Sequence, residues 1–530
     1  MKRRNFIKIT STAGLSAMFI PFVQCNSDAG KISSEDFPFL EITIEELQNQ
    51  MKSGVHTARS ITQIYLDRIA GIDKAGPKLN SVIELNPDAL TIADAMDTER
   101  KNGKIRGSMH GIPVLIKDNI DTADKMQTTA GSIAMEGNIA KSDAFIVQKL
   151  REAGAVILGK TNLSEWANFR SDRSSSGWSS RGGQTKNPYI LDRSPCGSSS
   201  GSGVAVAASL CAVAIGTETN GSIACPASMN GIVGIKPTVG LVSRSGIIPI
   251  SKTQDTAGPL ARTVTDAAVL LGIIAAVDSN DKVTEESKDK AKDYTKFLDK
   301  NGLKGKRIGV EKTFLKKHEG VDNLLHKALE QIKSQGAEIV EIEFMKFNDT
   351  DGAETDVLEF EFKDGLNKYL ITSNSKVKSL EELIAFNKKN EAKAMPDFKQ
   401  ETLESSQKRG DLTDKDYLAA LEKILNVRKL IDNELEKNKL DALCGPATGP
   451  SWCIDPVNGD FWTGYAAYGP AALAGYPSVT VPMGSFKEIP IGLSFLGKAY
   501  DESGLISIAY AYEQASKNRV KPGFKATITG

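Results

Sequence analysis

A glycine- and serine-rich segment, Cys196-Gly197-Ser198-Ser199-Ser200-Gly201-Ser202-Gly203, stands directly before an apolar run at 204–213. Flexible linkers are not flanked so closely by apolar sequence, so the pattern favours a tight turn at the start of a buried helix. The next segment, Gly216-Thr217-Glu218-Thr219-Asn220-Gly221-Ser222-Ile223, places a serine after two residue types that tolerate positive φ. Backbone N–H groups can therefore turn inward beside the Ser222 hydroxyl, which is how an oxyanion hole is formed.

Further upstream, Gly111-Ile112-Pro113-Val114-Leu115-Ile116-Lys117 places a lysine at the end of an apolar run. Most lysines are solvated surface charges. A lysine that follows a buried run can instead be desolvated, and desolvation lowers its pKa because the charged form loses its water. Bringing the pKa near 7 requires about 4 to 5 kcal/mol of differential solvation, which buried lysines reach. We therefore expect Lys117 to be a base at neutral pH.

Two literal motif matches indicate other chemistry, and neither fits its surroundings. Residues 154–161, with Lys160, match the phosphate-loop pattern G-x-x-x-x-G-K-T. Their middle residues are typical of a buried strand, whereas a phosphate loop must curl so that successive N–H groups converge. Residues 197–201 match G-x-S-x-G, which would make Ser199 the nucleophile of an α/β-hydrolase. That mechanism needs a downstream histidine, and His318 and His326 both lie in charged helical sequence.

The pattern of apolar, charged and Gly/Pro residues changes along the chain. Residues 42–101 are typical of helices, with a capping box at Thr43 and Glu46 and apolar residues at helical spacing through Ile61, Tyr65 and Ile69. Residues 111–275 alternate short apolar runs with Gly and Ser clusters, which indicates strands alternating with helices. A charged helical stretch follows at 279–438, with strand candidates at 307–310 and 337–343. Residues 440–500 are again interrupted by frequent glycines and prolines. These patterns predict an α/β fold.

Composition excludes several classes of function. The chain has 530 residues, is 40% hydrophobic, and carries 66 Lys and Arg against 66 Asp and Glu. Without an excess of positive charge, binding to nucleic acid is not expected. There are only 4 histidines, and no H-E-x-x-H or C-x-x-C spacing occurs. We therefore expect no metal site and no organic cofactor.

The first 25 residues predict export. A basic head at 2–4 precedes an apolar stretch at 13–23 that is too short to span a bilayer. Arg3-Arg4-Asn5-Phe6-Ile7-Lys8 resembles the twin-arginine signal. Cys25 stands where a lipoprotein would be cleaved and acylated, although the residues before it depart from a lipobox. We therefore expect an exported protein that is periplasmic or anchored to the membrane by a lipid on Cys25.

The other cysteines do not indicate a disulfide framework, since they are odd in number and scattered through apolar or Gly-rich sequence. They are Cys196, Cys211, Cys225, Cys444 and Cys453. We interpret them as buried thiols that act as small hydrophobes, and a Cys444–Cys453 bridge remains open.

The segments around Lys117, Ser198 and Ser222 together resemble the amidase signature family. That family carries a lysine after G-x-P-x-x-x-K, a G-S-S-G turn, and a G-G-S-I segment whose serine lies 24 residues after the first serine of the turn, the separation of Ser198 and Ser222 here. The resemblance continues through Gly231-Ile232-Val233-Gly234-Ile235-Lys236-Pro237 and Asp255-Thr256-Ala257-Gly258-Pro259. It covers about residues 42–275 and 440–525.

The resemblance implies one mixed central β-sheet covered by α-helices on both faces. It implies a single amidase domain at 40–525, with the signature core at about 105–275, a variable helical cover at about 279–438 and a C-terminal return to the core at about 440–525.

The resemblance also assigns roles to individual residues. Ser222 would be the nucleophile, Lys117 the base, and Ser198, on a cis peptide, the bridge that passes the proton between them. The oxyanion hole would consist of the backbone N–H groups of Thr219, Asn220, Gly221 and Ser222. The acyl pocket would be lined by Trp166, Ala167 and Asn168.

Departures from the family pattern bear on the substrate. Members usually have Asp and Gly-Gly where this chain has Glu218 and Asn220-Gly221, and an arginine where it has Ala224. This version is most similar to peptide amidases and unlike the glutamine-using subunit of the tRNA amidotransferase. We expect an amidohydrolase that cleaves a linear carboxamide, such as a peptide C-terminal amide, to a carboxylate and ammonia, without an obligate protein partner.

Two alternatives remain open. One is an esterase, or a hydrolase of aryl or fatty amides, that uses the same three residues. The other is a non-catalytic envelope protein that binds peptide ends, which is disfavoured because binding alone has no need for the lysine and both serines.

Overall fold

The structure is a computed structural model that describes residues 37–344, 350 and 352–528. The chain divides into two compact units, Met1–Leu40 and Glu41–Gly530. Of the first unit only residues 37–40 are described, so the predicted export signal at 1–25 and Cys25 lie outside the described residues. All elements below belong to the second unit.

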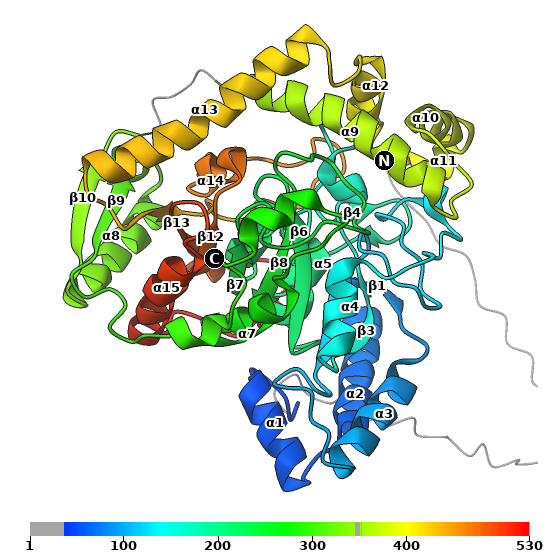
Figure 1. The fold of residues 1–530 in the computed structure, drawn as a ribbon, viewed down its shortest axis with the longest axis horizontal. Helices are drawn as coiled ribbons and strands as arrows, with labels where there is room; N and C mark the ends of the chain where they lie inside the picture. Colours follow the sequence, from blue (N-terminus) through cyan, green and yellow to red (C-terminus); the bar gives the residue numbers. More distant parts are fainter. Residues whose placement is uncertain (1–36, 345–349, 351, 529–530) are drawn as a thin grey trace, which may run out of the picture. The chain divides into compact units, whose positions relative to one another are not determined.

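The second unit alternates helices and strands along the chain (Figure 1). The α-helices are α1 Ile44–Ser53, α2 Ala58–Arg68, α3 Ala89–Lys101, α4 Phe145–Glu152, α5 Ser200–Ala207, α6 Ala224–Met229, α7 Val264–Ile274, α8 Glu319–Ser334, α9 Ala353–Thr372, α10 Leu380–Lys389, α11 Glu391–Ala394, α12 Glu401–Lys408, α13 Lys415–Lys437, α14 Gly469–Ala474 and α15 Glu502–Ser516. The strands are β1 Val82–Leu85, β2 Pro113–Lys117, β3 Val156–Thr161, β4 Trp178–Ser179, β5 Gly183–Gln184, β6 Val213–Glu218, β7 Val233–Lys236, β8 Thr256–Ala261, β9 Arg307–Glu311, β10 Glu338–Ile342, β11 Ala442–Pro446, β12 Ser478–Phe486 and β13 Ile489–Leu496.

One mixed sheet organises this unit. Among the described residues it has 11 strands in the order β1-β3-β2-β6-β8-β7-β12-β13-β11-β9-β10. Strands β3, β2 and β6 are parallel, and so are β11, β9 and β10, whereas the strands between these two groups pair antiparallel. Every residue of β2, β3 and β6 is buried. Strands of a parallel group must be covered on both faces, which explains why these read as nearly continuous apolar runs.

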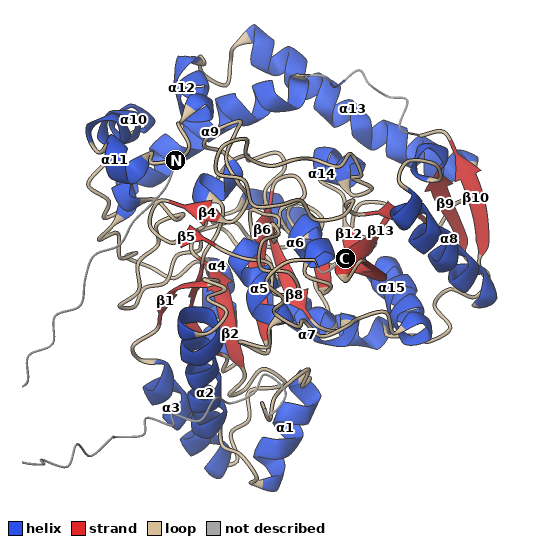
Figure 2. Ribbon diagram, turned by 180° about the vertical axis from the view of Figure 1, so that it is seen from behind, coloured by secondary structure: helices blue, strands red, loops and turns tan. Residues whose placement is uncertain are grey.

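Helices lie on both sides of the sheet (Figure 2). Helices α5 and α6 pack on each other and on the sheet, and α7 and α15 form a second such pair. Helix α5 is buried on every side and consists only of Ser, Gly, Val and Ala, whose small side chains allow close packing. The mixed sheet with helical layers expected from the family resemblance is confirmed.

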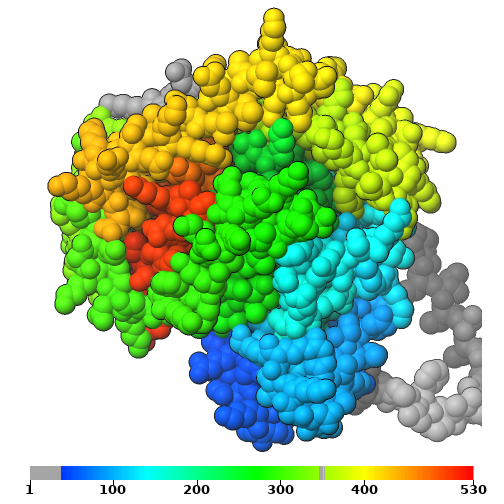
Figure 3. Space-filling view, in the orientation of Figure 1, coloured from blue at the N-terminus to red at the C-terminus, as the bar shows by residue number. Residues whose placement is uncertain are grey.

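Within the charged stretch at 279–438, β9 and β10 join the sheet, whereas helices α9 to α13 form a helical layer in which α9 and α13 pack along each other. Their contact buries Phe360 of α9 and Tyr417, Ile424 and Val427 of α13 in one apolar cluster. Figure 3 shows this layer, in yellow and yellow-green, along one edge of the space-filling view. The layer thus has its own apolar seam, although its outer surface is charged.

Most local predictions from the sequence are confirmed, and one region differs. Thr43 and Glu46 form the predicted capping box of α1, and the strand candidates at 307–310 and 337–343 are β9 and β10. The interpretation of 42–101 as helices throughout is wrong at β1, which pairs antiparallel with β3 at the edge of the sheet. β1 has only 4 residues, too few for a periodic signal, and its partner lies far along the chain.

Candidate active site

Lys117 is the last residue of β2, and its side chain is fully buried. Its Nζ lies 2.8 Å from Ser198 Oγ, and it donates to Thr217 Oγ1 at 2.7 Å and to the Thr217 carbonyl at 3.3 Å. Burial lowers the pKa of Lys117 to about 7, although the charges of Asp255 and Glu218 act in the opposite direction. A lysine in this state exchanges a proton with the Ser198 hydroxyl near neutral pH.

Ser198 stands on a turn immediately before α5, and the Gly197–Ser198 peptide is cis. The turn is packed so closely that a Cβ on Gly197 would lie 2.2 Å from Ser164 Oγ. Ser200 donates a hydrogen bond to the Cys196 carbonyl at 2.5 Å, and the Ser198 carbonyl accepts one from the Ser164 N–H at 3.1 Å. The Gly/Ser segment is therefore a hydrogen-bonded turn that fixes Ser198 beside Lys117.

Ser222 follows β6 in the loop that leads into α6. Glu218, the last residue of β6, accepts hydrogen bonds from the N–H groups of Ile223 and Ala224 at 2.7 and 2.9 Å, which fixes the start of α6. The positive φ of this loop falls on Gly221 (81°) and not on Asn220. A Cβ on Gly221 would also lie 2.5 Å from the Tyr468 hydroxyl, so only glycine fits there.

The loop presents free backbone donors beside Ser222. In the described part of the chain, the N–H groups of Thr219, Asn220, Gly221 and Ser222, the four predicted donors, donate no hydrogen bond within the protein. Buried N–H groups are nearly always paired, so a row of free ones at a cavity wall is suited to bind an oxyanion.

The structure joins the three predicted catalytic residues unequally. Lys117 and Ser198 are directly hydrogen-bonded, whereas the hydrogen bonds of the described residues include none between the Ser198 and Ser222 hydroxyls. Ser222 is held to the turn through the backbone instead, because its carbonyl accepts from the Ser199 N–H at 3.3 Å.

A cavity of about 210 Å³ opens at Ser222. Ala167 and Asn168 line it, together with the loop at 219–222. Trp166, which we expected in the pocket, is not among the lining residues; its indole is buried in a core cluster with Met135 and Phe362. A large aromatic ring beside apolar neighbours gains more by full burial than by lining a polar cleft.

The remaining walls of the cavity come from segments that sequence reasoning missed. Leu358 comes from α9, while Trp452, Asp460, Trp462 and Tyr468 come from the segment between β11 and α14. No motif marks these residues, because each reaches the cavity from an element distant in sequence. The helical layer at 279–438 is therefore part of the site and not only a cover.

A disulfide joins Cys196 and Cys225, with their Cα atoms 5.9 Å apart. It links the turn that carries Ser198 to the helix that follows Ser222. The interpretation of these two cysteines as free thiols is therefore wrong, and so is the open Cys444–Cys453 bridge, since both of those thiols are free. The two bridged residues are far apart in sequence, and only the fold brings them together.

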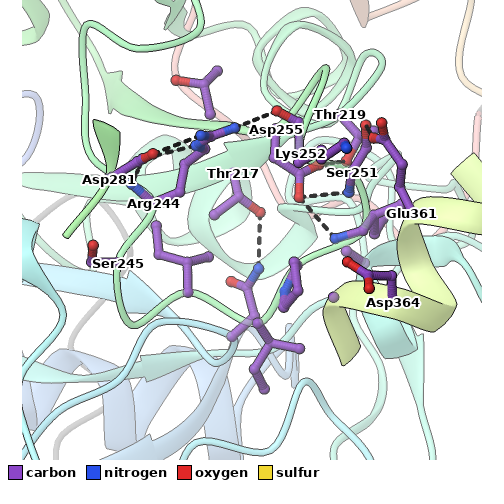
Figure 4. A pocket seen from close by; sticks show the side chains of 18 of the residues that line it. Thr217, Thr219, Arg244, Ser245, Ser251, Lys252, Asp255, Asp281, Glu361 and Asp364 are labelled. Atoms are coloured by element: carbon purple, nitrogen blue, oxygen red, sulfur yellow. Dashed lines mark hydrogen bonds and ion pairs between the residues drawn. The ribbon is translucent and has the colours of Figure 1, made fainter. Parts of the chain in front are cut away.

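A second cavity, of about 230 Å³, is also lined by Thr219 of the same loop. Figure 4 shows Thr217, Thr219 and Asp255 at its wall. Thr219 Oγ1 donates to Asp255 Oδ1 at 2.6 Å, and Asp255 also accepts from the N–H groups of Ile250 and Ser251. Burial raises the pKa of Asp255 to about 6. Asp255 thereby anchors the loop that carries the candidate oxyanion hole.

The structure excludes both misleading motif matches. Residues 156–161 form β3, and Lys160 is buried within it, so no phosphate loop exists there. Ser199 is fully buried, donating to the Thr217 carbonyl at 3.0 Å and accepting from the Thr217 N–H at 3.1 Å. His318 and His326 belong to the start and the body of α8, and neither contacts Ser199.

Comparison with known proteins identifies similar chains over almost the whole length. The sequence model of the family described as Amidase matches residues 60–506. A probable amidase of Arabidopsis thaliana is 41% identical, covering 93% of each chain, and a putative amidase of Schizosaccharomyces pombe is 38% identical, covering 91% of this chain and 87% of its own. The crystal structure of native peptide amidase from Stenotrophomonas maltophilia is 49% identical with a TM-score of 0.88, covering 92% of this chain and 99% of that one.

The predicted location is wrong. Two relatives similar over nearly the whole chain come from a plant and a yeast, which lack the bacterial envelope that a twin-arginine signal and a lipobox serve. Within residues 37–344, 350 and 352–528, no helix has the length and apolar character needed to cross a membrane. The prediction rested on a basic head before a short apolar segment, a pattern too short to be specific.

Proposed function

Because the chain belongs to the amidase family and is an amide-hydrolysing enzyme, we propose that it cleaves the C-terminal carboxamide of peptides with Ser222, Ser198 and Lys117 as its catalytic residues. The observation that carries the proposal is the 2.8 Å contact between a fully buried Lys117, of pKa about 7, and Ser198, on the turn that backs Ser222. Neutral lysine is the base that this chemistry requires.

The proposed reaction has two halves. In acylation, Lys117 takes the proton of Ser198 while Ser198 takes that of Ser222, and the Ser222 oxygen attacks the amide carbonyl carbon. The N–H groups of Asn220, Gly221 and Ser222 stabilise the oxyanion, each donor contributing about 3 kcal/mol. The C–N bond then breaks, and the relay returns the proton to the departing nitrogen, which leaves as ammonia. Water, activated by the same relay, hydrolyses the acyl-enzyme.

The proposal requires the Ser198 and Ser222 hydroxyls to meet when substrate binds. Catalytic hydrogen bonds are often long in free enzymes and tighten only in the substrate complex. The backbone bond between Ser199 N–H and the Ser222 carbonyl supports this step, because it keeps the two segments adjacent.

Three features support a peptide amide as the substrate. The similar crystal structure is that of a peptide amidase. The family arginine is absent at Ala224, so that position offers no charge to bind a substrate carboxylate. Trp462, which is 46% exposed, stands at the wall of the cavity, where an aromatic ring can pack against a peptide side chain.

The test is ammonia release from peptide amides, free amino-acid amides, fatty amides and matched esters. We expect peptide amides to be cleaved, and the Ser222→Ala variant to lose at least about 10³-fold in kcat while keeping its melting temperature. Turnover of esters alone would contradict the proposal, as would full activity of the Ser222→Ala variant.

A further inference from the structure

Two glutamates on one face of α9 hold the loops of the candidate active site. Glu354 and Glu361 are seven residues apart, which places them two helical turns apart on the same side. Glu361 accepts hydrogen bonds from Ser251 Oγ at 2.5 Å and from Thr253 N–H and Oγ1 at 3.0 and 2.6 Å. Figure 4 shows Glu361 extending from its helix to Ser251. Helix α9 is therefore attached to the segment at 251–253, next to Asp255.

Glu354 makes similar hydrogen bonds, and one of them is with the loop that carries Ser222. Its Oε1 accepts from Asn220 Nδ2 at 2.7 Å and from Gln254 Nε2 at 2.9 Å. Gln254 is fully buried, and the same Nε2 lies 3.5 Å from the Thr219 carbonyl. One carboxylate oxygen of Glu354 thus binds two side chains. One is that of Asn220, and the other is that of Gln254, which faces the Thr219 carbonyl.

The Thr219–Asn220 peptide is consequently held on several sides. Thr219 Oγ1 bonds to Asp255, the Thr219 carbonyl faces Gln254, and the Asn220 side chain bonds to Glu354. The N–H of this peptide is one of the free donors beside Ser222. The next residue is Gly221, with a positive φ and no side chain to restrain it. The bonds to Thr219 and Asn220 therefore fix where the free donors point.

Asn220 also departs from the Gly-Gly pattern of the family, and in the structure its side chain makes a hydrogen bond that glycine could not make. A glycine at 220 has no side chain to bond to α9, whereas the asparagine amide reaches Glu354. The backbone at 220 does not need the left-handed region, so glycine is not required there.

We propose that Glu354 is a positioning residue that aligns the oxyanion-hole donors through Asn220 and Gln254. The inference rests on the proposed function, because it takes Ser222 as the nucleophile. Glu354 does not touch the reacting atoms; it acts by holding the loop at 219–221. Since the hole is complementary to the transition state, a loosened loop lowers kcat more than it raises KM.

The test compares variants at 354 with a matched control on the same helix turn. Glu354→Ala removes both contacts, and we expect kcat on a peptide amide to fall about tenfold with KM changed by less than about threefold. Glu354→Gln keeps an acceptor oxygen in place, and we expect it to retain kcat within about threefold of wild type. Asp356→Ala is the control, because Asp356 pairs with Arg409 at 2.5 Å and makes no contact with the loop.

Two inhibitors separate positioning from a general loss of structure. A peptide aldehyde adds to the Ser222 hydroxyl and places an oxygen in the hole, whereas the matched peptide alcohol has no carbonyl and cannot form an oxyanion. We expect Glu354→Ala to weaken binding of the aldehyde about tenfold and to leave binding of the alcohol unchanged, as required for a contact that acts on the transition state. Asn220→Gly removes one of the two contacts of Glu354 and leaves that with Gln254, so it should give part of this effect, and the double variant with Glu354→Ala should match Glu354→Ala alone.

Each remaining outcome decides against the inference. Equal weakening of both inhibitors, or equal losses in the Glu354→Ala and Asp356→Ala variants, shows a structural role only. If Glu354→Ala does not fold, an Asn220→Gly variant with wild-type kcat overturns the proposal. A wild type that releases no ammonia from any amide overturns the proposed function and this inference with it, whereas active wild type with fully active Glu354→Ala overturns the positioning role alone.

Discussion

Strands β2 and β3 lie side by side, and each carries a fully buried lysine near its end, Lys117 and Lys160. Lys117 contacts the Ser198 hydroxyl, whereas Lys160 donates to the Ile120 carbonyl at 2.6 Å and to Thr128 Oγ1 at 3.1 Å. Burial lowers the pKa of both lysines, but four carboxylates act against it at Lys160 and only two at Lys117.

The difference shows that burial alone is no ground for proposing that a lysine is catalytic. What distinguishes Lys117 is a reactive hydroxyl as its partner, on a turn that adjoins an open cavity. The hydrogen-bond partners of Lys160 are a carbonyl and a threonine hydroxyl, and neither belongs to the turn at Ser198. Lys160 belongs to the more specific-looking motif, but the apolar residues inside that motif already favour a strand over a phosphate loop.

The largest expected effect comes from replacing each lysine by methionine, which keeps the length and removes the proton acceptor. We predict that Lys117→Met lowers kcat for a peptide amide by at least about 10³-fold. Lys160→Met should keep kcat within about threefold but lower the free energy of unfolding by about 2 kcal/mol, because it removes one of the two cations near the buried Asp118 carboxylate and leaves only Arg181. Steady-state kinetics and urea unfolding of both variants measure these effects.

Equal loss of activity in the two variants would contradict the distinction between Lys117 and Lys160, because the effect could then be due to burial of a lysine alone. The distinction also fails if Lys117→Met retains turnover while Lys160→Met does not.

The pH profile sharpens the same comparison. Lys117 with a pKa of about 7 is protonated below that pH and cannot accept the Ser198 proton, so activity should fall as pH decreases through 7. We predict that kcat/KM drops about tenfold per pH unit on the acid side and is level above about pH 8. The charges facing Lys117 are Asp255 and Glu218, which both raise its pKa. An acid limb near pH 4 to 5 would instead indicate a carboxylate base.

The parts of this site that could be predicted are those encoded within a few residues. The run before Lys117 indicates a buried strand, and the Gly/Ser segment indicates the turn, because strand burial and turn chemistry depend on neighbouring residues. Glu354 contacts Asn220 across 134 residues of chain, so no local pattern could have paired them. Trp452 and Trp462 reach the cavity in the same non-local way.

The Cys196–Cys225 disulfide tests whether the two serine segments need a covalent link. Replacing both cysteines by serine releases a connection across 29 residues, and we predict a loss of about 3 kcal/mol in the free energy of unfolding. Because the hydrogen bonds of the turn remain, kcat should fall by only about threefold. Cys453→Ser is the control, since that thiol is free and exposed. Mass spectrometry that finds Cys196 alkylated in the native protein would show that the link is absent.

The smallest expected effect is that of replacing Ser199. Comparing it with Ser198 tests two neighbouring serines in the same way as the methionine variants test two buried lysines. Ser198 contacts Lys117, whereas the Ser199 hydroxyl bonds only to the backbone of Thr217. We predict that Ser199→Ala keeps kcat within about fivefold and lowers the free energy of unfolding by about 1 to 2 kcal/mol, the cost of leaving buried backbone groups unpaired. The same substitution at Ser198 should remove activity with little loss of stability. If Ser199→Ala were instead inactive while Ser198→Ala kept its activity, the hydrogen bond between Lys117 and Ser198 would have no catalytic role.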